Sequence, residues 1–106
     1  MIRERNFRGR SAEIDIVAEE AGHLCFVEVK GRSGAGFGAP EEAVTAEKQR
    51  RIARAALEYL VRRRLPPSTP CRFDVVAVIV SGGTARVTIL RGAFPFPESL
   101  AARVLN

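Results

Sequence analysis

The sequence has no tryptophan, one histidine and two cysteines, and these small numbers exclude several kinds of site. His23, Cys25 and Cys71 are too few for a structural zinc site, which takes four ligands, and they show no CxxC spacing. A single histidine beside a turn also provides no Ser/His/Asp or Cys/His nucleophile set. We interpret both cysteines as small buried residues and the histidine as a surface residue.

Long apolar runs are also absent, and none approaches the roughly 18 residues that a membrane-spanning helix requires. The arginine-rich start lacks the apolar segment of a signal peptide. The chain has 106 residues, of which 46% are hydrophobic and 27% charged, as expected for one globular domain over residues 1–106. We therefore expect a cytoplasmic protein with no membrane partner.

Acidic residues are in the minority, since 17 Lys and Arg stand against 12 Asp and Glu and give a net charge of +5. This excess favours a polyanionic partner. Lys30 and Lys48 are the only lysines among the basic residues. A compact ammonium suits a place beside a reacting phosphate and water better than a guanidinium does, which makes Lys30 a candidate catalytic residue.

The centre of the expected fold is an antiparallel hairpin. Two runs rich in β-branched residues flank the dipeptide Ala21-Gly22, a combination that predicts two strands joined by a tight turn. Centred on that turn, the register places Asp15 opposite Glu28 and Glu13 opposite Lys30. Three carboxylates and one ammonium then share one patch at the end of the hairpin.

This patch has two interpretations. Asp15 and Glu28 are predicted to lie close enough to hold one metal ion, and because facing carboxylates repel, either Lys30 or a divalent cation must supply positive charge. The alternative is a solvated hairpin edge with an ordinary cross-strand ion pair. The opposite face of the hairpin is expected to carry Ile14, Ile16, Cys25, Val27 and Val29, and the patch face Val17, Leu24 and Phe26. Apolar residues on both faces predict a sheet covered on both sides.

The flanking segments complete an α/β pattern. Residues 1–10 predict an edge strand through Phe7 and then a basic turn, and residues 31–40 a glycine-rich loop that either folds over a ligand or is a plain connector. Thr45 is the expected N-cap of a helix from Ala46 to about Arg63. Its apolar stripe is predicted to be Ile52, Ala53, Ala56, Leu57 and Leu60, with Gln49 one turn earlier and the charged patch as one candidate partner.

The last third of the chain reads as two more strands. Residues 71–80 are continuously apolar, which predicts an interior strand, and residues 84–90 a shorter one. Asp74 is expected to pair with a neighbour such as Arg72 or Arg86, with a place in the acidic patch as the alternative. We expect the segment from Phe94 to Pro97 to be exposed and helical turns to start at Glu98.

An acidic pair holding Mg²⁺ or Mn²⁺ beside a lysine, in a basic protein, predicts hydrolysis of phosphodiester bonds. Lys30 would orient or help deprotonate the attacking water, while Glu13 and Gln49 would complete the site. Five cations are expected to contact a nucleic-acid backbone, with solvated surface charge as the alternative for each: Arg8, Arg10, Arg32, Lys48 and Arg51.

These residues resemble a known superfamily. Asp15, then Glu28-Val29-Lys30, then Gln49 on a helix resemble the PD-(D/E)xK restriction-endonuclease-like proteins, which include Holliday-junction resolvases. Five blocks in order resemble more closely the YraN family of small bacterial proteins, over most of the chain: RNFRGRSAEIDIVA, FVEVKGR, FGAPEEAV, EKQRRIARAALEYL and CRFDVVAV.

The resemblance implies that Asp15 and Glu28 bind the metal and that Lys30 is the third catalytic element, with Glu13 and Gln49 at further family positions. It also implies a three-layer α/β sandwich around a central mixed sheet. Proteins of this kind begin with a helix that often carries another acid and is missing here. A bare sheet face would favour a homodimer or other self-association, or else the chain has lost its first segment.

Three functions are therefore expected as alternatives. The first is a Mg²⁺- or Mn²⁺-dependent endonuclease that acts on DNA, at branched or damaged structures. The second is a nucleic-acid-binding module that has kept the fold and lost catalysis. The third is a small interaction subunit whose charges are ordinary surface.

Overall fold

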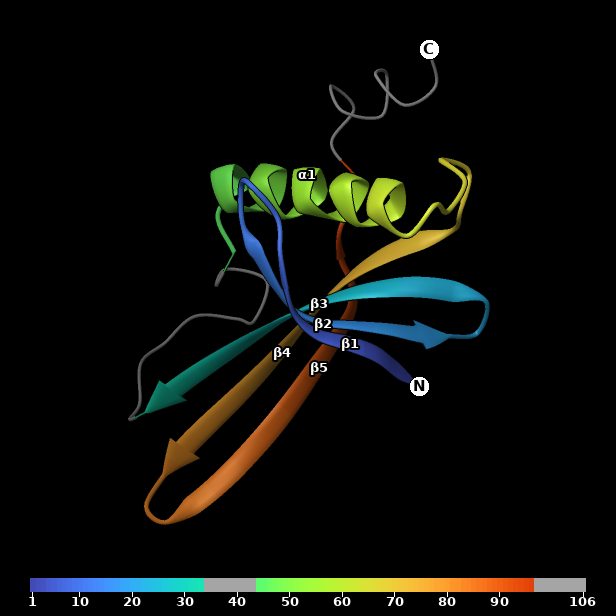
Figure 1. Ribbon diagram of the computed structural model, residues 1–106. Coiled ribbons are helices and arrows are strands. Elements are labelled where there is room, and N and C mark those ends of the chain that lie inside the picture. Colours follow the sequence, from blue (N-terminus) through green and yellow to red (C-terminus); the bar gives the residue numbers. More distant parts are fainter. Residues whose placement is uncertain (34–43, 97–106) are drawn as a thin grey trace.

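A computed structural model describes residues 1–33 and 44–96, which form one five-stranded mixed sheet and one helix (Figure 1). The elements in chain order are β1 (Ile2–Arg8), β2 (Glu13–Glu20), β3 (His23–Ser33), α1 (Ala46–Arg62), β4 (Cys71–Ser81) and β5 (Thr84–Phe94). The strands lie in sequence order, and all neighbours are antiparallel except β3 and β4, which are parallel and joined through α1. The predicted α/β class and mixed sheet are confirmed.

Both tight hairpins turn where the sequence predicts. Ala21 and Gly22 have φ angles of 50° and 79°, and Gly82 and Gly83 have φ angles of 55° and 77°. Positive φ at both central residues is the requirement of the two-residue turns whose twist matches the twist of the flanking strands. The β2–β3 turn sets the predicted register, from Glu20 opposite His23 to Ile16 opposite Val27.

Helix α1 begins as predicted and ends one residue before the expected end. Thr45 is the N-cap, and its side-chain oxygen accepts a hydrogen bond from the backbone N–H of Lys48. Its buried face is rotated slightly from the predicted stripe, because Ala55 and Tyr59 are buried while Leu57 is only half-buried. Seventeen residues make up α1. Within the described residues, no helix has both the length and the apolar character to cross a membrane.

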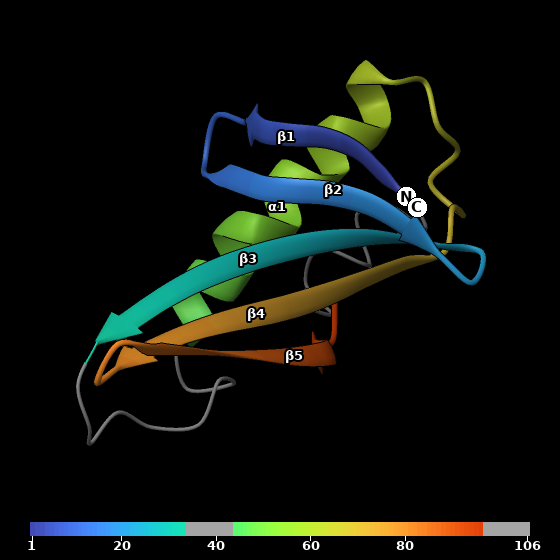
Figure 2. The ribbon, with the colours of Figure 1, turned by 90° about the horizontal axis from the view of Figure 1, so that it is seen from below.

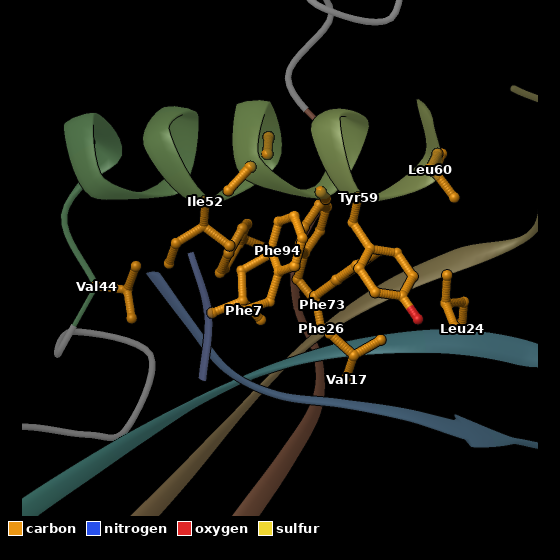
Figure 3. Packing of buried hydrophobic residues seen from close by; sticks show 14 of the residues in the cluster. Phe7, Val17, Leu24, Phe26, Val44, Ile52, Tyr59, Leu60, Phe73 and Phe94 are labelled. Atoms are coloured by element: carbon orange, nitrogen blue, oxygen red, sulfur yellow. The ribbon is translucent and has the colours of Figure 1, made fainter. Parts of the chain in front are cut away.

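The core lies between α1 and one face of the sheet and is rich in aromatic rings (Figure 3). Tyr59 of α1 meets Phe7 and Phe26 edge to face, with ring centroids 5.1 and 5.7 Å apart. Phe73 stacks on Phe94 at 4.8 Å. Such pairs add about 0.5–1.5 kcal/mol each beyond the area that they bury. The aromatic contacts of Tyr59 therefore fix α1 over β1 and β3, and Phe73 extends the aromatic cluster to β4 and β5.

The C-terminal part of the described chain differs from the sequence prediction. Strand β5 is as long as β4, 11 residues each, and it continues to Phe94. Phe94 is buried and Phe96 packs against the core, so the prediction of an exposed segment is wrong for both rings, whereas Pro95 is exposed and Pro97 lies outside the described residues. The two rings fill the space beside Phe73, a contact between distant parts of the sequence. The helical turns expected from Glu98 lie outside the described residues.

Two further predictions need correction. Ile14 and Val17 were assigned to opposite faces, yet both are buried in the same core cluster. Strict alternation cannot place residues three apart on one face, so β2 is irregular between them. The described residues also form two layers and not three, because α1 covers one face of the sheet and no described helix covers the other (Figures 1 and 2).

Candidate functional site

The two predicted acids lie side by side at the end of the β2–β3 ladder. Regular pairing ends at Ile16 and Val27, and at the next position Asp15 bonds to β3 through its side chain. Its Oδ2 accepts a hydrogen bond of 2.8 Å from the backbone N–H of Val29, the neighbour of Glu28 in the chain. The backbone of β3 thus anchors one acid directly beside the other.

The predicted pairing of Glu13 with Lys30 is wrong. Because the β2–β3 ladder stops at Ile16, Glu13 pairs with Arg8 of β1, and its Oε2 lies 3.5 Å from the Arg8 Nε. Glu13 nevertheless lines the same cavity as Asp15. Its carboxylate lies at the mouth of the site, beside an exposed arginine.

Glu28 is the most confined group of the site. Its carboxylate is buried, with 7% of the residue exposed, and two ammonium groups contact the same oxygen. Lys48 Nζ lies 2.7 Å and Lys30 Nζ 3.3 Å from Glu28 Oε1. A carboxylate taken out of water needs such compensation, because desolvation strongly disfavours an unpaired charge. The shared contact also confirms that Glu28 and Lys30 project from the same face of β3.

The two lysines differ in how readily they lose a proton. The neighbouring ammonium of Lys48, followed by burial, lowers the pKa of Lys30. The hydrogen bond to Glu28 raises the pKa of Lys48. Lys48 is thus the more firmly charged cation, and Lys30 is the group from which a proton leaves more easily.

The contact of Lys48 with Glu28 was missed by sequence reasoning, which placed this lysine among the DNA-contacting cations. The first turn of α1 projects it over the middle of β3, a placement that depends on tertiary packing. Two signals in the sequence could have pointed to it. Lysine is rare in this chain, and position 48 lies three residues after the N-cap, at the end of a helix that packs on the sheet.

Asp15 and Glu28 line a cavity of about 390 Å³ that lies between the β1–β2 connection and the start of α1. It is lined by Ser11, Ala12, Glu13, Asp15, Glu28, Lys48 and Arg51. Three of these residues are acidic and two are basic, so charged side chains dominate the cavity. A polar, open hollow of this kind suits a charged, hydrated ligand such as a phosphate diester better than an apolar molecule.

Three of the predicted DNA-contacting arginines lie close to this cavity. Arg8 and Arg10 flank the β1–β2 connection, and their side chains are largely exposed. Arg51 lines the cavity and pairs with Glu47 one turn earlier on α1, at 2.7 Å. The side chain of Arg32 lies outside the described part of the chain.

The side chain of Gln49 points toward the segment that precedes α1. Its Nε2 donates a hydrogen bond of 3.1 Å to the backbone carbonyl of Val44. The charged patch was one candidate partner for this amide, and the contact found is with the backbone. Gln49 therefore tethers the segment that enters α1, and a role in catalysis stays a prediction.

The side chains at the cavity could supply some of the ligands that a divalent cation needs. Within residues 1–33 and 44–96, no three or more His, Cys, Asp or Glu side chains form a group that could hold a metal ion. Asp15 and Glu28 nevertheless bring two carboxylates to one cavity. Mg²⁺ is commonly held by one or two carboxylates, with water and substrate phosphate completing its octahedron. The two ammonium groups on Glu28 show that this acid already attracts cations.

Four other charged residues, Glu20, Arg72, Asp74 and Arg91, form a separate network on the other face of the sheet. Asp74 accepts two hydrogen bonds from Arg72, both 2.9 Å, which confirms one of its two predicted pairings. Cys25 and Cys71 are free thiols, buried and half-buried, as the sequence predicts. His23 is exposed beside the β2–β3 turn. None of the three lines the acidic cavity.

Fold and site together define a small basic α/β protein in which two acids and Lys48 line one open cavity, and Lys30, which is not among the lining residues, contacts Glu28. The chain belongs to the Uncharacterised protein family UPF0102, which it matches over residues 1–78. That span contains every residue of the site, and it confirms the family resemblance that the sequence predicts.

Curated relatives in several bacteria share this similarity. The UPF0102 protein of Lachnoclostridium phytofermentans is 52% identical over 90 residues, which cover 85% of this chain and 73% of the relative. The UPF0102 protein of Symbiobacterium thermophilum is 53% identical over 91 residues, which cover 85% of this chain and 76% of the relative. The UPF0102 protein of Syntrophotalea carbinolica is 52% identical over 93 residues, which cover 88% of this chain and 75% of the relative.

Proposed function

We propose that this protein is a metal-dependent nuclease that hydrolyses DNA phosphodiester bonds in the cytoplasm, with the restriction-endonuclease-like arrangement of the PD-(D/E)xK superfamily. One observation carries the proposal. Glu28 and the anchored carboxylate of Asp15 line one cavity open to solvent, and Lys30 Nζ lies 3.3 Å from Glu28 Oε1. Two acids with an amine in contact are what assisted hydrolysis of a phosphodiester requires.

Asp15 and Glu28 would hold Mg²⁺ or Mn²⁺, which supplies activation of water and neutralisation of phosphate charge. The hydrogen bond from Val29 keeps the Asp15 carboxylate in one orientation. Lys30 is placed to orient the attacking water or to take up its proton, because its ammonium lies at the acid pair. Glu13 at the cavity mouth and Gln49 at the start of α1 are the proposed supporting residues.

The cations near the cavity would bind the substrate backbone. Arg8 and Arg10 on one side and Arg51 on the other offer guanidinium groups to consecutive phosphates. Lys48, at the cavity wall, would turn from Glu28 to a phosphate oxygen when substrate is present. Arg32 completes the proposed set. Binding of this kind depends little on sequence and weakens steeply with salt.

A nucleic-acid-binding module without catalysis is the second candidate. The observation that favours it is the acid count, since no third acid completes a metal-holding group within the described residues. The contacts of Lys30 and Lys48 with the buried Glu28 also resemble ion pairs that stabilise a fold and take no part in catalysis. Under this alternative the cations near the cavity still bind DNA, and the acids serve only to position them.

A cleavage assay tests the proposal. The protein is incubated with supercoiled, single-stranded and four-way-junction DNA in Mg²⁺ or Mn²⁺, beside Asp15→Asn, Glu28→Gln and Lys30→Ala. The matched control is Glu19→Gln, which neutralises an acid in β2 that pairs with Arg3 and does not line the cavity. Circular dichroism confirms that each variant is folded.

Cleavage by wild type and by Glu19→Gln that is lost in the other three variants supports the nuclease. Salt-sensitive DNA binding without cleavage supports the binding module. If neither occurs, both nucleic-acid functions are wrong, and the interaction subunit is the function left.

A further inference from the structure

The face of the sheet opposite α1 is a broad apolar surface. Figure 2 views the sheet from this side, with α1 behind it. The registers of β3, β4 and β5 place their side chains in rows across it, for example Val29 beside Val76 and Val76 beside Ile89. Five of the exposed large hydrophobic residues lie on this face: Ile2, Val29, Val80, Val87 and Ile89. Monomeric proteins rarely leave so large an apolar patch in contact with water.

The charges on this face neutralise one another. Arg72 contacts Asp74 and Glu20, each at 2.9 Å, and Arg91 contacts the same Glu20 at 2.8 Å. Two positive and two negative groups leave the network without net charge, whereas the whole chain carries +5. These paired charges therefore offer a polyanion little to bind, and the exposed Arg5, opposite Ile16, adds one positive charge at the β1 edge of the face. Two copies can dock over the network without leaving its charges unpaired.

The area of the face matches what a stable dimer buries. Strands β3, β4 and β5 have 11 residues each. At about 3.3 Å per residue and 4.8 Å between strands they span roughly 500 Å², and β1 and β2 bring the face to roughly 750 Å². A standard interface buries about 800 Å² per partner.

The residues at the borders of the described ranges lie on the α1 side of the sheet. Val44 is buried in the core under α1, and Phe96 stacks on Phe73 in the same core. Within residues 1–33 and 44–96, no element covers the apolar face.

We infer that two copies of this chain associate through the face opposite α1, sheet against sheet, about a twofold axis. Twofold pairs are the commonest assemblies, and two sheets pack face to face about 10 Å apart. Glu28 and Lys30 project from β3 on the α1 side, together with Phe26. The acidic cavities therefore lie on the outer surfaces of the dimer, and the pairing does not depend on the proposed nuclease function.

Sedimentation velocity from 1 to 100 µM protein tests this inference. Wild type is expected to sediment as twice the chain mass of 11.6 kDa. Val87→Glu places a charge at the 60% exposed Val87 and should raise the dimer dissociation constant at least tenfold with an unchanged circular dichroism spectrum. Val61→Glu is the matched control, since Val61 is 76% exposed on α1 and that variant should remain dimeric.

If Val87→Glu does not fold, Ile89→Thr is the milder variant for the same measurement. A monomeric wild type at 100 µM overturns the inference. So does a dimer that survives substitution of Val87 or Ile89 and dissociates in Val61→Glu, because the interface would then include α1.

Discussion

Lys48 Nζ, from the first turn of α1, lies 2.7 Å from Oε1 of Glu28 in the middle of β3. This ion pair joins the helix to the sheet at the wall of the cavity that Asp15 and Glu28 line. It also places an ammonium where the proposed metal ion would share the same carboxylate. The two cations therefore compete for Glu28.

Lys48→Met tests this competition. Removal of a unit charge about 4 Å from a divalent metal ion relieves about 2 kcal/mol of repulsion in water, so Mn²⁺ should bind roughly thirty times more tightly to the variant. Titration calorimetry at low salt measures the affinity. Arg50→Met is the control, because it removes a positive charge from an exposed position of the same helix that does not line the cavity. Equal Mn²⁺ affinity in all three proteins would mean that Glu28 is not a metal ligand.

Glu20 gives the fold a predictable response to acid. Hydrogen bonds from Arg91 and then Arg72 hold the pKa of Glu20 below its ordinary value of 4.5. A carboxyl whose pKa is lowered by folding stabilises the native state above the unfolded-state pKa, and this contribution disappears as pH falls through the folded-state pKa. Urea unfolding should show Glu20→Gln less stable than wild type at pH 7, with the difference shrinking below pH 4.5. The difference should also shrink in 1 M salt, because exposed charges are screened. If the stability difference between Glu20→Gln and wild type does not change with pH, the loss of stability comes from packing and not from the charge of Glu20.

Gly9 is required where the β1–β2 connection approaches α1. A methyl group at this position would lie 2.6 Å from Glu58 Oε2 and 3.0 Å from the Ala55 side chain. Glu58 has little room to move, because it accepts a hydrogen bond from the Arg10 N–H at 2.9 Å. Gly9→Ala should therefore lower the free energy of unfolding by about 1–2 kcal/mol, measured by urea titration. Gly31→Ala is the control, since a methyl group there meets no atom within 4 Å, and no loss is expected.

Phe94 fixes the end of β5 to the core. It is 8% exposed, and its ring stacks on Phe73 at 4.8 Å. Phe94→Ala should cost about 3–4 kcal/mol in thermal or urea unfolding, the usual loss for a buried aromatic residue. Val61→Ala, at an exposed position on α1, should change stability by less than about 0.5 kcal/mol. A small effect of Phe94→Ala would mean that β5 ends earlier, as the sequence predicted.

Local features of this fold could be predicted from the sequence, because short-range chemistry determines them. The turn at Ala21-Gly22 sets the β2–β3 register, and the Thr45 hydroxyl sets the start of α1. The adjacency of Asp15 and Glu28 follows from that register. Each of these features depends on residues close together in the chain.

Features that depend on distant contacts could not be predicted. Phe94 looked exposed because a Phe-Pro repeat gives no periodic signal, and its stacking partner lies in another strand. The sequence predicts Lys48 only as a surface cation that contacts DNA, because its contact with Glu28 exists only after the helix packs on the sheet. The irregularity of β2 between Ile14 and Val17 likewise reflects the demands of the core.

The hydrogen bond from Val29 N–H to Asp15 Oδ2 gives position 15 a second constraint, separate from any chemistry. A short side chain with an oxygen acceptor must stand there to join two strands whose backbones no longer pair. Asparagine meets that demand and carries no charge, whereas alanine would leave the amide without this acceptor and loosen the hairpin. If the proposed nuclease reaction is correct, a homologue that had lost it but kept the architecture would be expected to carry asparagine in place of the aspartate, a substitution that would mark an inactive descendant.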